Sequence, residues 1–365
     1  MPDKTKVLLC FKRPLPDDYI GGLVTLCNNY IDKKDIFAEC GIDISCFNYE
    51  LPVSGRIGNI RNSKARNIIY GFKQIQSLKR YLSVNDCTVH IHTSRKALFF
   101  KDVLLACSIR KKCRGKIFMT IHVGDISTVF HNAYTQRFLI RIMNRSIDKV
   151  LFLSEFMRRQ FVEAGLKESR SEVLYNFYNV RPTPPEDKPV NHKRRFLYLG
   201  SINREKGILE LMAAFSEIDD DFQVDLCGFF LEEDIKEPFL SSVAKLGDKA
   251  TYHGYVNKER KEELLRRADV LVLPSYREGL PISILEAMAN SCAVITTPVG
   301  AIPELFDGRN AVIIPPRNVE ALKNAISLLI KDTGLLNLMK TTNYSASSVF
   351  NDTSHIKKLC RLYKQ

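Results

Sequence analysis

The chain has 365 residues, 45% of them hydrophobic and 26% charged, with no Trp. This composition excludes a disordered or fibrous protein, and the length predicts two domains. Residues 1–180 hold 29 Lys and Arg against 16 Asp and Glu, whereas residues 181–365 hold 25 of each, so the net charge of +13 arises entirely in the first half.

Short apolar or β-branched runs in the first half predict buried parallel strands at 6–11, 89–92, 117–122 and 149–153. Between them, 67–82 and 134–147 have the apolar period of amphipathic helices. Strands that alternate with helices in this way are typical of βαβ units on a parallel sheet.

A proline-rich segment at 179–189 separates the two halves and predicts a linker without regular structure. The strand pattern then resumes at 195–200, 222–227, 250–253, 270–274, 293–296 and 311–314. The sequence therefore predicts two doubly wound α/β domains, with ligands beyond the carboxyl ends of the strands. The expected domains are 1–180, a linker at 181–192, and 193–345, with a C-terminal helix at 346–365 that packs back on the first domain.

The loop after the strand at 270–274 has the features of a phosphate seat. Pro281 suits the first position of a helix, and Gly279 permits close approach of the backbone. The N–H groups of Gly279, Leu280 and Ile282 would then point at the ligand from the positive end of the helix.

Two carboxylates border this loop, Glu278 before it and Glu286 on the second helical turn. Because carboxylates repel phosphate, they should accept hydrogen bonds from neutral hydroxyls, which a nucleotide sugar carries on both sides of its diphosphate. The alternative is that Glu278 caps the helix and Glu286 lies on the surface.

The region 268–304 resembles the Glu-x7-Glu segment of the family 4 retaining glycosyltransferases of GT-B fold. The matching pieces are Ala268-Asp269-Val270, Pro274-Ser275, Glu278-Gly279-Leu280-Pro281, Leu285-Glu286-Ala287-Met288-Ala289, Pro298-Val299-Gly300-Ala301 and Pro303-Glu304. The resemblance implies two Rossmann-like domains that face each other across a cleft. It also implies that Glu278 contacts the transferred sugar and Glu286 the ribose.

Other landmarks follow in the family's order. Gly200, Arg204 and Lys206 fall in a segment similar to the diphosphate-binding loop, with Lys206 as the matching cation. Ser201 stands where the family usually has Arg, and Arg204 is the candidate replacement. Gly21-Gly22 matches the family's glycine loop, His122 its histidine near the sugar, Ser154-Glu155 and Asn176 two further positions, and Tyr255 lies in the loop expected near the base.

The resemblance implies transfer with retention and without an enzymic nucleophile. The expected catalytic residues are Glu278, His122 and Lys206, and the expected donor is a UDP-sugar. No cofactor and no metal are expected. The acidic triplet Asp219-Asp220-Asp221 lies between a helix at 209–217 and the strand at 222–227, so we interpret it as a turn and not as a metal-binding motif.

The basic first half predicts contact with an anionic membrane and a lipid-linked saccharide acceptor. Arg137, Arg141 and Arg145 form one helical stripe, beside an apolar stripe of Phe138, Ile142 and Met143. Solvated helix faces over a core stripe are the alternative. No apolar run is long enough for a membrane span, the run at 7–11 is too short for a signal peptide, and the ten cysteines lack metal-ligand spacing. We therefore expect a cytoplasmic protein, peripheral on the inner face of the membrane.

Three rival functions are compatible with parts of the sequence. A same-fold nucleotide-sugar enzyme such as an epimerase would need no separate acceptor. A nucleic-acid-binding or nucleic-acid-modifying protein would show aromatic residues among the basic ones in a recognisable module, and nucleic acid is not an expected partner. A degenerate carbohydrate-binding scaffold would not need Glu278, Glu286, Lys206 and His122 together.

Overall fold

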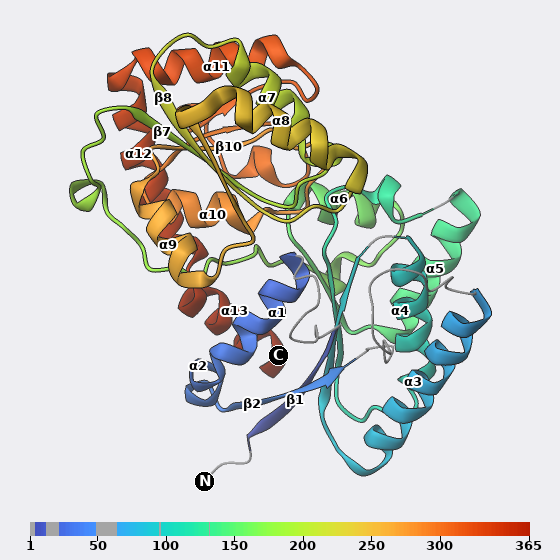
Figure 1. The fold of residues 1–365 in the computed structure, drawn as a ribbon. Helices are drawn as coiled ribbons and strands as arrows, with labels where there is room; N and C mark the ends of the chain where they lie inside the picture. The colour runs from blue at the N-terminus through green and yellow to red at the C-terminus, as the bar shows by residue number, and fades with distance from the viewer. Residues whose placement is uncertain (1–3, 12–21, 49–63, 95, 131) are drawn as a thin grey trace. The chain divides into compact units, whose positions relative to one another are not determined.

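The structure, a computed structural model, describes residues 4–11, 22–48, 64–94, 96–130 and 132–365 (Figure 1). The chain divides into two compact units. The first consists of Met1–Tyr175 and Thr353–Gln365, and the second of Asn176–Asp352. The proline-rich segment thus belongs to the second unit, and the last helix belongs to the first.

The first unit is built on a parallel sheet with the strand order β2-β1-β3-β4-β5-β6. Its strands are β1 (Thr5–Phe11), β2 (Ile42–Asn48), β3 (Thr88–Thr93), β4 (Ile117–Ile121), β5 (Lys149–Phe152) and β6 (Ser171–Val173). The central strands β3 and β4 are buried along their whole length. β4 is therefore apolar except for Thr120, whereas β3 buries His90 and His92 between its β-branched residues.

Helices cover both faces of this sheet (Figure 1). They are α1 (Gly22–Asp32), α2 (Lys34–Glu39), α3 (Lys64–Val84), α4 (Lys96–Ile109), α5 (Ala133–Ser146), α6 (Glu155–Glu163) and α13 (Asp352–Lys364). On one face α3, α4 and α5 lie side by side, and α1 and α13 lie on the other. A core that includes Phe99, Met119, Met143 and Phe152 fills the space between sheet and helices.

The second unit has a parallel sheet with the order β12-β11-β10-β7-β8-β9. Its strands are β7 (Arg194–Leu199), β8 (Phe222–Cys227), β9 (Ala250–Gly254), β10 (Val270–Leu273), β11 (Ala293–Thr296) and β12 (Val312–Ile313). The chain builds outward from β7 to β9 and then returns to the other side of β7 with β10. The loops after β7 and β10 therefore flank the switch point where ligands bind in doubly wound sheets.

The helices of the second unit are α7 (Ile208–Ser216), α8 (Lys236–Leu246), α9 (Lys258–Arg267), α10 (Ile282–Ala289), α11 (Val319–Lys331) and α12 (Thr333–Ser347). Helix α7 packs against α8 and α11, whereas α10 packs against α12. The predicted α/β class is confirmed. The two edge strands of the first sheet, the seven-residue β2 and the three-residue β6, were not predicted. None of the helices in the described ranges combines the length and apolar character that a membrane span requires.

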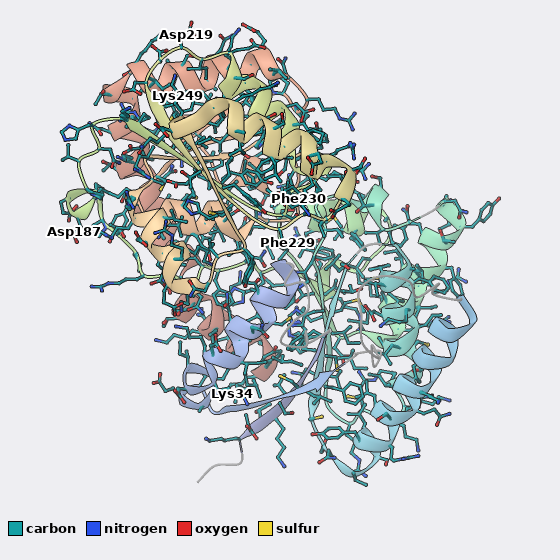
Figure 2. All side chains as sticks on the ribbon, in the orientation of Figure 1. Lys34, Asp187, Asp219, Phe229, Phe230 and Lys249 are labelled. Atoms are coloured by element: carbon teal, nitrogen blue, oxygen red, sulfur yellow. The ribbon has the colours of Figure 1, made fainter. Side chains whose placement is uncertain are left out.

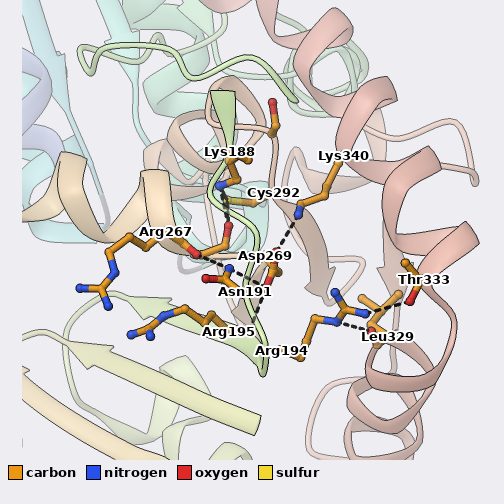
Figure 3. Close-up of polar contacts among 12 residues, drawn as sticks. Lys188, Asn191, Arg194, Arg195, Arg267, Asp269, Cys292, Leu329, Thr333 and Lys340 are labelled. Atoms are coloured by element: carbon orange, nitrogen blue, oxygen red, sulfur yellow. Dashed lines mark hydrogen bonds and ion pairs between the residues drawn. The ribbon is translucent and has the colours of Figure 1, made fainter. Parts of the chain in front are cut away.

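The proline-rich segment is held firmly on the second unit, contrary to the expectation of a plain linker. It contains a turn of 3-10 helix at Pro185–Asp187. Lys188 Nζ donates to the carbonyls of Leu265 at 2.9 Å and Ala268 at 2.5 Å, and Asn191 Nδ2 donates to Asp269 Oδ2 at 3.0 Å (Figure 3). Burial lowers the pKa of Lys188. Side-chain contacts thus replace the backbone ladder that the prolines remove.

Candidate active site

The loops that follow β7 and β10 are in direct contact at the carboxyl edge of the second sheet. The Tyr276 N–H donates to the Glu205 carbonyl at 2.8 Å. Gly207 has a φ of +67°, and a Cβ there would lie 2.2 Å from the Pro274 carbonyl oxygen. A glycine is therefore required at 207, both for the left-handed backbone and for the close approach of the two loops.

This contact brings together Lys206 and Glu278, two of the predicted site residues. Lys206 Nζ lies 2.5 Å from Glu278 Oε1, which also accepts from Ser275 Oγ at 2.8 Å. The Glu278 side chain is only 9% exposed. Its other oxygen, Oε2, has no hydrogen-bond partner among the described residues. The site thus pairs the Lys206 ammonium with a carboxylate whose second oxygen can accept a hydrogen bond from a ligand.

Lys206 is held in place by the turn that precedes it. The Asn203 side chain accepts from the Lys206 N–H at 3.1 Å and donates to Ser201 Oγ at 2.9 Å. Ser201, at the position where the family named above usually has Arg, is therefore part of the turn that orients Lys206. Beneath it, burial and then the charge of Glu278 raise the pKa of Tyr198, whose hydroxyl donates to the Ser201 carbonyl at 2.7 Å.

The turn at Glu278-Gly279-Leu280 is fixed by backbone contacts from two sides. The Ala301 N–H donates to the Gly279 carbonyl at 2.8 Å, and Asn176 Nδ2 donates to the Leu280 carbonyl at 2.7 Å. Gly300 has a φ of +60°, and a Cβ there would lie 2.2 Å from the Glu278 carbonyl oxygen. The glycine in Pro298-Val299-Gly300-Ala301 therefore lets the backbone support Glu278.

Helix α10 begins one residue later than predicted, because Pro281 is its N-cap with extended backbone and Ile282 its first residue. The N–H groups of Gly279, Leu280 and Ile282 have no acceptor within the described ranges. They lie at the positive end of α10. Backbone donors and the Lys206 ammonium at one loop are the arrangement that binds phosphate in proteins.

Glu286 lies on the second turn of α10 and is buried. Its Oε1 lies 2.5 Å from Nζ of Lys261 on α9, so the charge of this buried carboxylate is compensated. The expectation of a surface residue is thereby excluded. Within the described ranges, Oε2 has no partner and remains able to accept from a hydroxyl.

Arg204 and Tyr255 were predicted to bind the donor. Arg204 forms ion pairs with Glu232 at 2.5 Å and Asp234 at 2.7 Å, and the hydrogen bonds that it donates to Asp234 and then to Glu232 raise its pKa. A phosphate would have to draw Arg204 away from these carboxylates, and its role stays a prediction. Tyr255 follows β9 and is 59% exposed, so its ring is free to contact a base.

The acidic triplet lies at the opposite edge of the sheet, before the amino end of β8. Lys249 lies near Asp219 (Figure 2), where its Nζ donates to the Asp219 carbonyl at 3.3 Å. It also donates to the Asp220 carbonyl at 3.0 Å, and Lys193 pairs with Asp221 at 2.9 Å. These contacts are those of a surface turn. Across the described ranges no three His, Cys, Asp or Glu side chains are grouped to hold a metal ion. Metal independence itself stays a prediction.

In the first unit, His122 directly follows β4 at the carboxyl edge of the sheet and is half-buried. Burial, with a smaller effect of His355, lowers its pKa to about 3, so the imidazole is neutral at physiological pH. Gly22 is the first residue of α1, and Gly21 lies outside the described residues. Ser154 caps α6 by accepting from the Met157 N–H at 3.0 Å, which is a structural role.

Helix α5 presents Arg137, Arg141 and Arg145 to solvent, as the sequence predicts. The predicted apolar stripe is wrong, because Met143 is fully buried whereas Phe138 is 53% exposed. Leu139, Ile140 and Met143 form the buried face instead. The exposed face therefore combines three arginines with two aromatic rings, Phe138 and the 83% exposed Tyr134.

Three contributors were not predicted from the sequence. Ser275 binds Glu278, Asn203 binds the Lys206 backbone, and Lys261 pairs with Glu286. Asn203 carried a signal, since Asn three residues before the Lys206 N–H is typical of a cap. Lys261 carried none, because it lies in a charged run that looks like a solvated helix face.

Comparison with known proteins identifies a family similar to part of the chain. Residues 181–346 match the model of the family described as glycosyl transferases group 1. The chain is 42% identical over 89 residues to N,N'-diacetylbacillosaminyl-diphospho-undecaprenol alpha-1,3-N-acetylgalactosaminyltransferase of Campylobacter jejuni, over 23% of each chain. Further curated relatives, 26 to 34% identical, are matched over 32 to 68% of their own length.

Two solved structures share the fold over almost the whole chain. Sucrose-phosphate synthase from Thermosynechococcus elongatus has a TM-score of 0.78 at 18% identity, and Anabaena HepE in complex with UDP has 0.71 at 16%, each covering 99% of both chains. These likenesses show the GT-B fold. Residues 181–346 are thus similar to the glycosyl transferases of group 1, within a chain whose two units have the GT-B fold.

Proposed function

We propose that the chain is a retaining, metal-independent glycosyltransferase. It would move a hexose or N-acetylhexosamine from a nucleotide sugar, a UDP-sugar by preference, to a hydroxyl of a saccharide acceptor in cell-surface polysaccharide or glycolipid biosynthesis. The observation that carries the proposal is the meeting of Lys206 and Glu278 at the switch point of the second sheet, beside the free N–H groups at the start of α10. The similarity to group 1 glycosyl transferases supports it.

In this reaction the bond between the anomeric carbon and the diphosphate oxygen breaks, and a bond to the acceptor oxygen forms on the same face. The acceptor's proton passes to the departing phosphate. Lys206 and the N–H groups of Gly279, Leu280 and Ile282 stabilise the charge that develops on that phosphate. The remaining contribution is positioning of donor and acceptor.

The two carboxylates bind hydroxyls in this proposal. Glu278 already has Oε1 engaged by Lys206 and Ser275, so Oε2 accepts from the transferred sugar. Glu286 accepts from the ribose while Lys261 holds its other oxygen. His122 is assigned to the transferred sugar, as the resemblance implies, and Tyr255 to the base.

Nucleotide binding is expected to raise the midpoint of thermal unfolding, and Glu286→Gln to reduce that rise. A ligand at 100 times its dissociation constant stabilises the folded state by about 2.7 kcal/mol. A hydrogen bond to a charged group contributes roughly 1.5–3 kcal/mol and one between neutral groups about 1 kcal/mol, so an amide that still accepts should weaken nucleotide affinity about 3- to 30-fold. The measurement is the midpoint with UDP, GDP, ADP and their sugars.

Glu217→Gln is the matched control. Glu217 follows the carboxyl end of α7, whereas Lys206 precedes its amino end, and Glu217 forms an exposed ion pair with Lys323 of α11. It should leave the response to nucleotides unchanged. If no nucleotide or nucleotide sugar shifts the wild-type midpoint while DNA does, the glycosyltransferase proposal fails and a nucleic-acid function takes its place.

We further propose a lipid-linked acceptor and contact of α5 with an anionic membrane surface. The Campylobacter relative carries a diphospho-undecaprenol acceptor in its name. The exposed face of α5 combines Arg137, Arg141 and Arg145 with Tyr134 and Phe138. Aromatic rings and cationic side chains on one face are typical of helices that lie at a membrane interface.

Replacing all three arginines by Gln should weaken flotation with anionic vesicles at low salt about 100-fold. Each cation near an anionic leaflet contributes about 1 kcal/mol. The control replaces three exposed cations elsewhere in the first unit, Lys111, Lys112 and Arg114, by Gln. Equal losses in both variants would assign binding to net charge alone, and absence of wild-type flotation would remove the membrane proposal.

A further inference from the structure

Four histidines of the first unit, His90, His92, His122 and His355, lie near one another. Two of them, His92 and His122, form a hydrogen-bonded pair. His92 is the penultimate residue of β3, and its Nδ1 lies 3.0 Å from Nε2 of His122. The two rings are stacked, with centroids 5.3 Å apart. The His92 side chain is buried, with the residue 3% exposed. The backbone N–H of His122 donates to the Thr93 carbonyl at 2.9 Å. The pair is therefore held by both side chains and backbone.

Both imidazoles are neutral. Burial lowers the pKa of His122 to about 3 and the pKa of His92 well below its usual value. A neutral imidazole carries one N–H and one bare nitrogen. Across the 3.0 Å contact, one ring must therefore donate and the other accept, and this choice fixes the position of the remaining proton on each ring.

The other nitrogen of His92 decides between the two arrangements. Its Nε2 is buried and has no hydrogen-bond partner among the described residues. The rings of Phe11 and Tyr30 lie around it, with centroids 6.3 Å and 5.7 Å from that of His92. If His122 donated, His92 would carry its proton on Nε2, and a buried N–H would be left unpaired. Orphaned buried N–H groups are rarer than underused acceptors.

We propose that His92 is a positioning residue whose Nδ1–H donates to His122 Nε2 and thereby fixes the proton of His122 on Nδ1. His122 then presents a hydrogen-bond donor, with its lone pair occupied, at the carboxyl edge of β4. This form binds a hydroxyl or phosphate oxygen and cannot accept a proton from the acceptor. That it meets the transferred sugar rests on the proposed function, whereas the position of the proton does not.

The test is the tautomer of His122, read from long-range nitrogen–proton correlations in protein labelled with 15N-histidine. In the wild type we expect the proton on Nδ1. In His92→Phe the donor is lost, and His122 should move to the Nε2–H form that free histidine prefers. His92→Asn places an amide nitrogen where Nδ1 was, so it should restore the Nδ1–H form.

His355→Asn is the matched control, because it keeps a donor to the Tyr175 carbonyl, which His355 Nδ1 contacts at 2.7 Å, and should leave the tautomer of His122 unchanged. An Nε2–H form of His122 in the wild type would overturn the inference, whether or not the Phe variant folds. So would an unchanged tautomer in a folded His92→Phe.

Release of UDP from UDP-glucose and UDP-N-acetylglucosamine separates this inference from the proposed function. If His122 has the expected tautomer but His122→Ala releases UDP at the wild-type rate, the sugar role of His122 fails and the positioning by His92 stands. If His122→Ala is slow and the tautomer is wrong, the positioning fails and the sugar role stands. When both hold, His92→Phe should slow release and His92→Asn recover it.

Discussion

Lys206→Met is expected to lower the rate of glycosyl transfer by roughly 10²- to 10³-fold, the effect of removing one preorganised group that stabilises developing charge. The loss should fall on kcat, because the charge on the departing phosphate is greatest in the transition state. The measurement is release of nucleoside diphosphate from the sugar donor that stabilises the wild type most.

The same substitution should also destabilise the fold, since it leaves Glu278, 9% exposed, without its cation. Breaking a buried ion pair from one side costs about 3–5 kcal/mol, and the partial exposure of Lys206 places the effect at the lower end. Glu278→Gln added to Lys206→Met should restore the unfolding midpoint without restoring turnover. This separates the structural role of the pair from its role in the reaction.

Lys323→Met is the control. Lys323 forms ion pairs with Glu217 and Glu320, and both of these carboxylates are more than half exposed. Such pairs contribute little to stability, so both midpoint and turnover should remain near those of the wild type. Wild-type turnover in Lys206→Met would contradict the assignment of this cation to the diphosphate.

Acidification from pH 7 to pH 5 is expected to lower stability steeply, because the first unit buries neutral histidines. Burial is the main cause that lowers the pKa of His90, His122 and His355 to about 3. In the unfolded chain these groups have pKa values near 6.5. Between about pH 6.5 and pH 3 the unfolded state therefore binds more protons, and stability rises with pH.

Burial also lowers the pKa of His92, so four histidines contribute. Each gives a slope of up to about 1.4 kcal/mol per pH unit, and together they approach about 5.5 kcal/mol per unit. The measurement is the unfolding midpoint at constant ionic strength across this range. Carboxylates add to acid destabilisation, and His355→Asn isolates the histidines because it should reduce their slope by about a quarter. His192→Asn, at an exposed position, should keep the full slope. A midpoint that stays flat down to pH 5 would contradict the buried neutral cluster.

Most of the fold could be predicted because parallel strands buried on both faces are rich in apolar and β-branched residues. This holds even for β3, which buries His90 and His92 between Val89 and Ile91. β2 escaped prediction although Ile42 and Ile44 are buried and Asp43 and Ser45 exposed, an alternation typical of an edge strand. β6 has three residues and depends on pairing with β5, so no local pattern could reveal it.

In the site, spacing along the chain predicted Glu278 and Glu286 but not their partners. Lys206 meets Glu278 because two loops that are 72 positions apart follow adjacent strands. Lys261 reaches Glu286 from another helix, and His92 reaches His122 from the next strand. These pairings depend on strand order and register, which composition and periodicity do not encode residue by residue.

The return of the last helix has a consequence for synthesis of the chain. His355 and Tyr363 of α13 are buried in the first unit, where their side chains bind Tyr30 at 2.7 Å and His90 at 2.5 Å. During synthesis the strands of the first sheet leave the ribosome early, but His355 and Tyr363, which pack inside the same unit, are among the last residues to be made. The second unit can therefore complete its fold before the first unit does. A premature stop codon near residue 352 would leave all residues of the second unit in place but remove the last helix from the first.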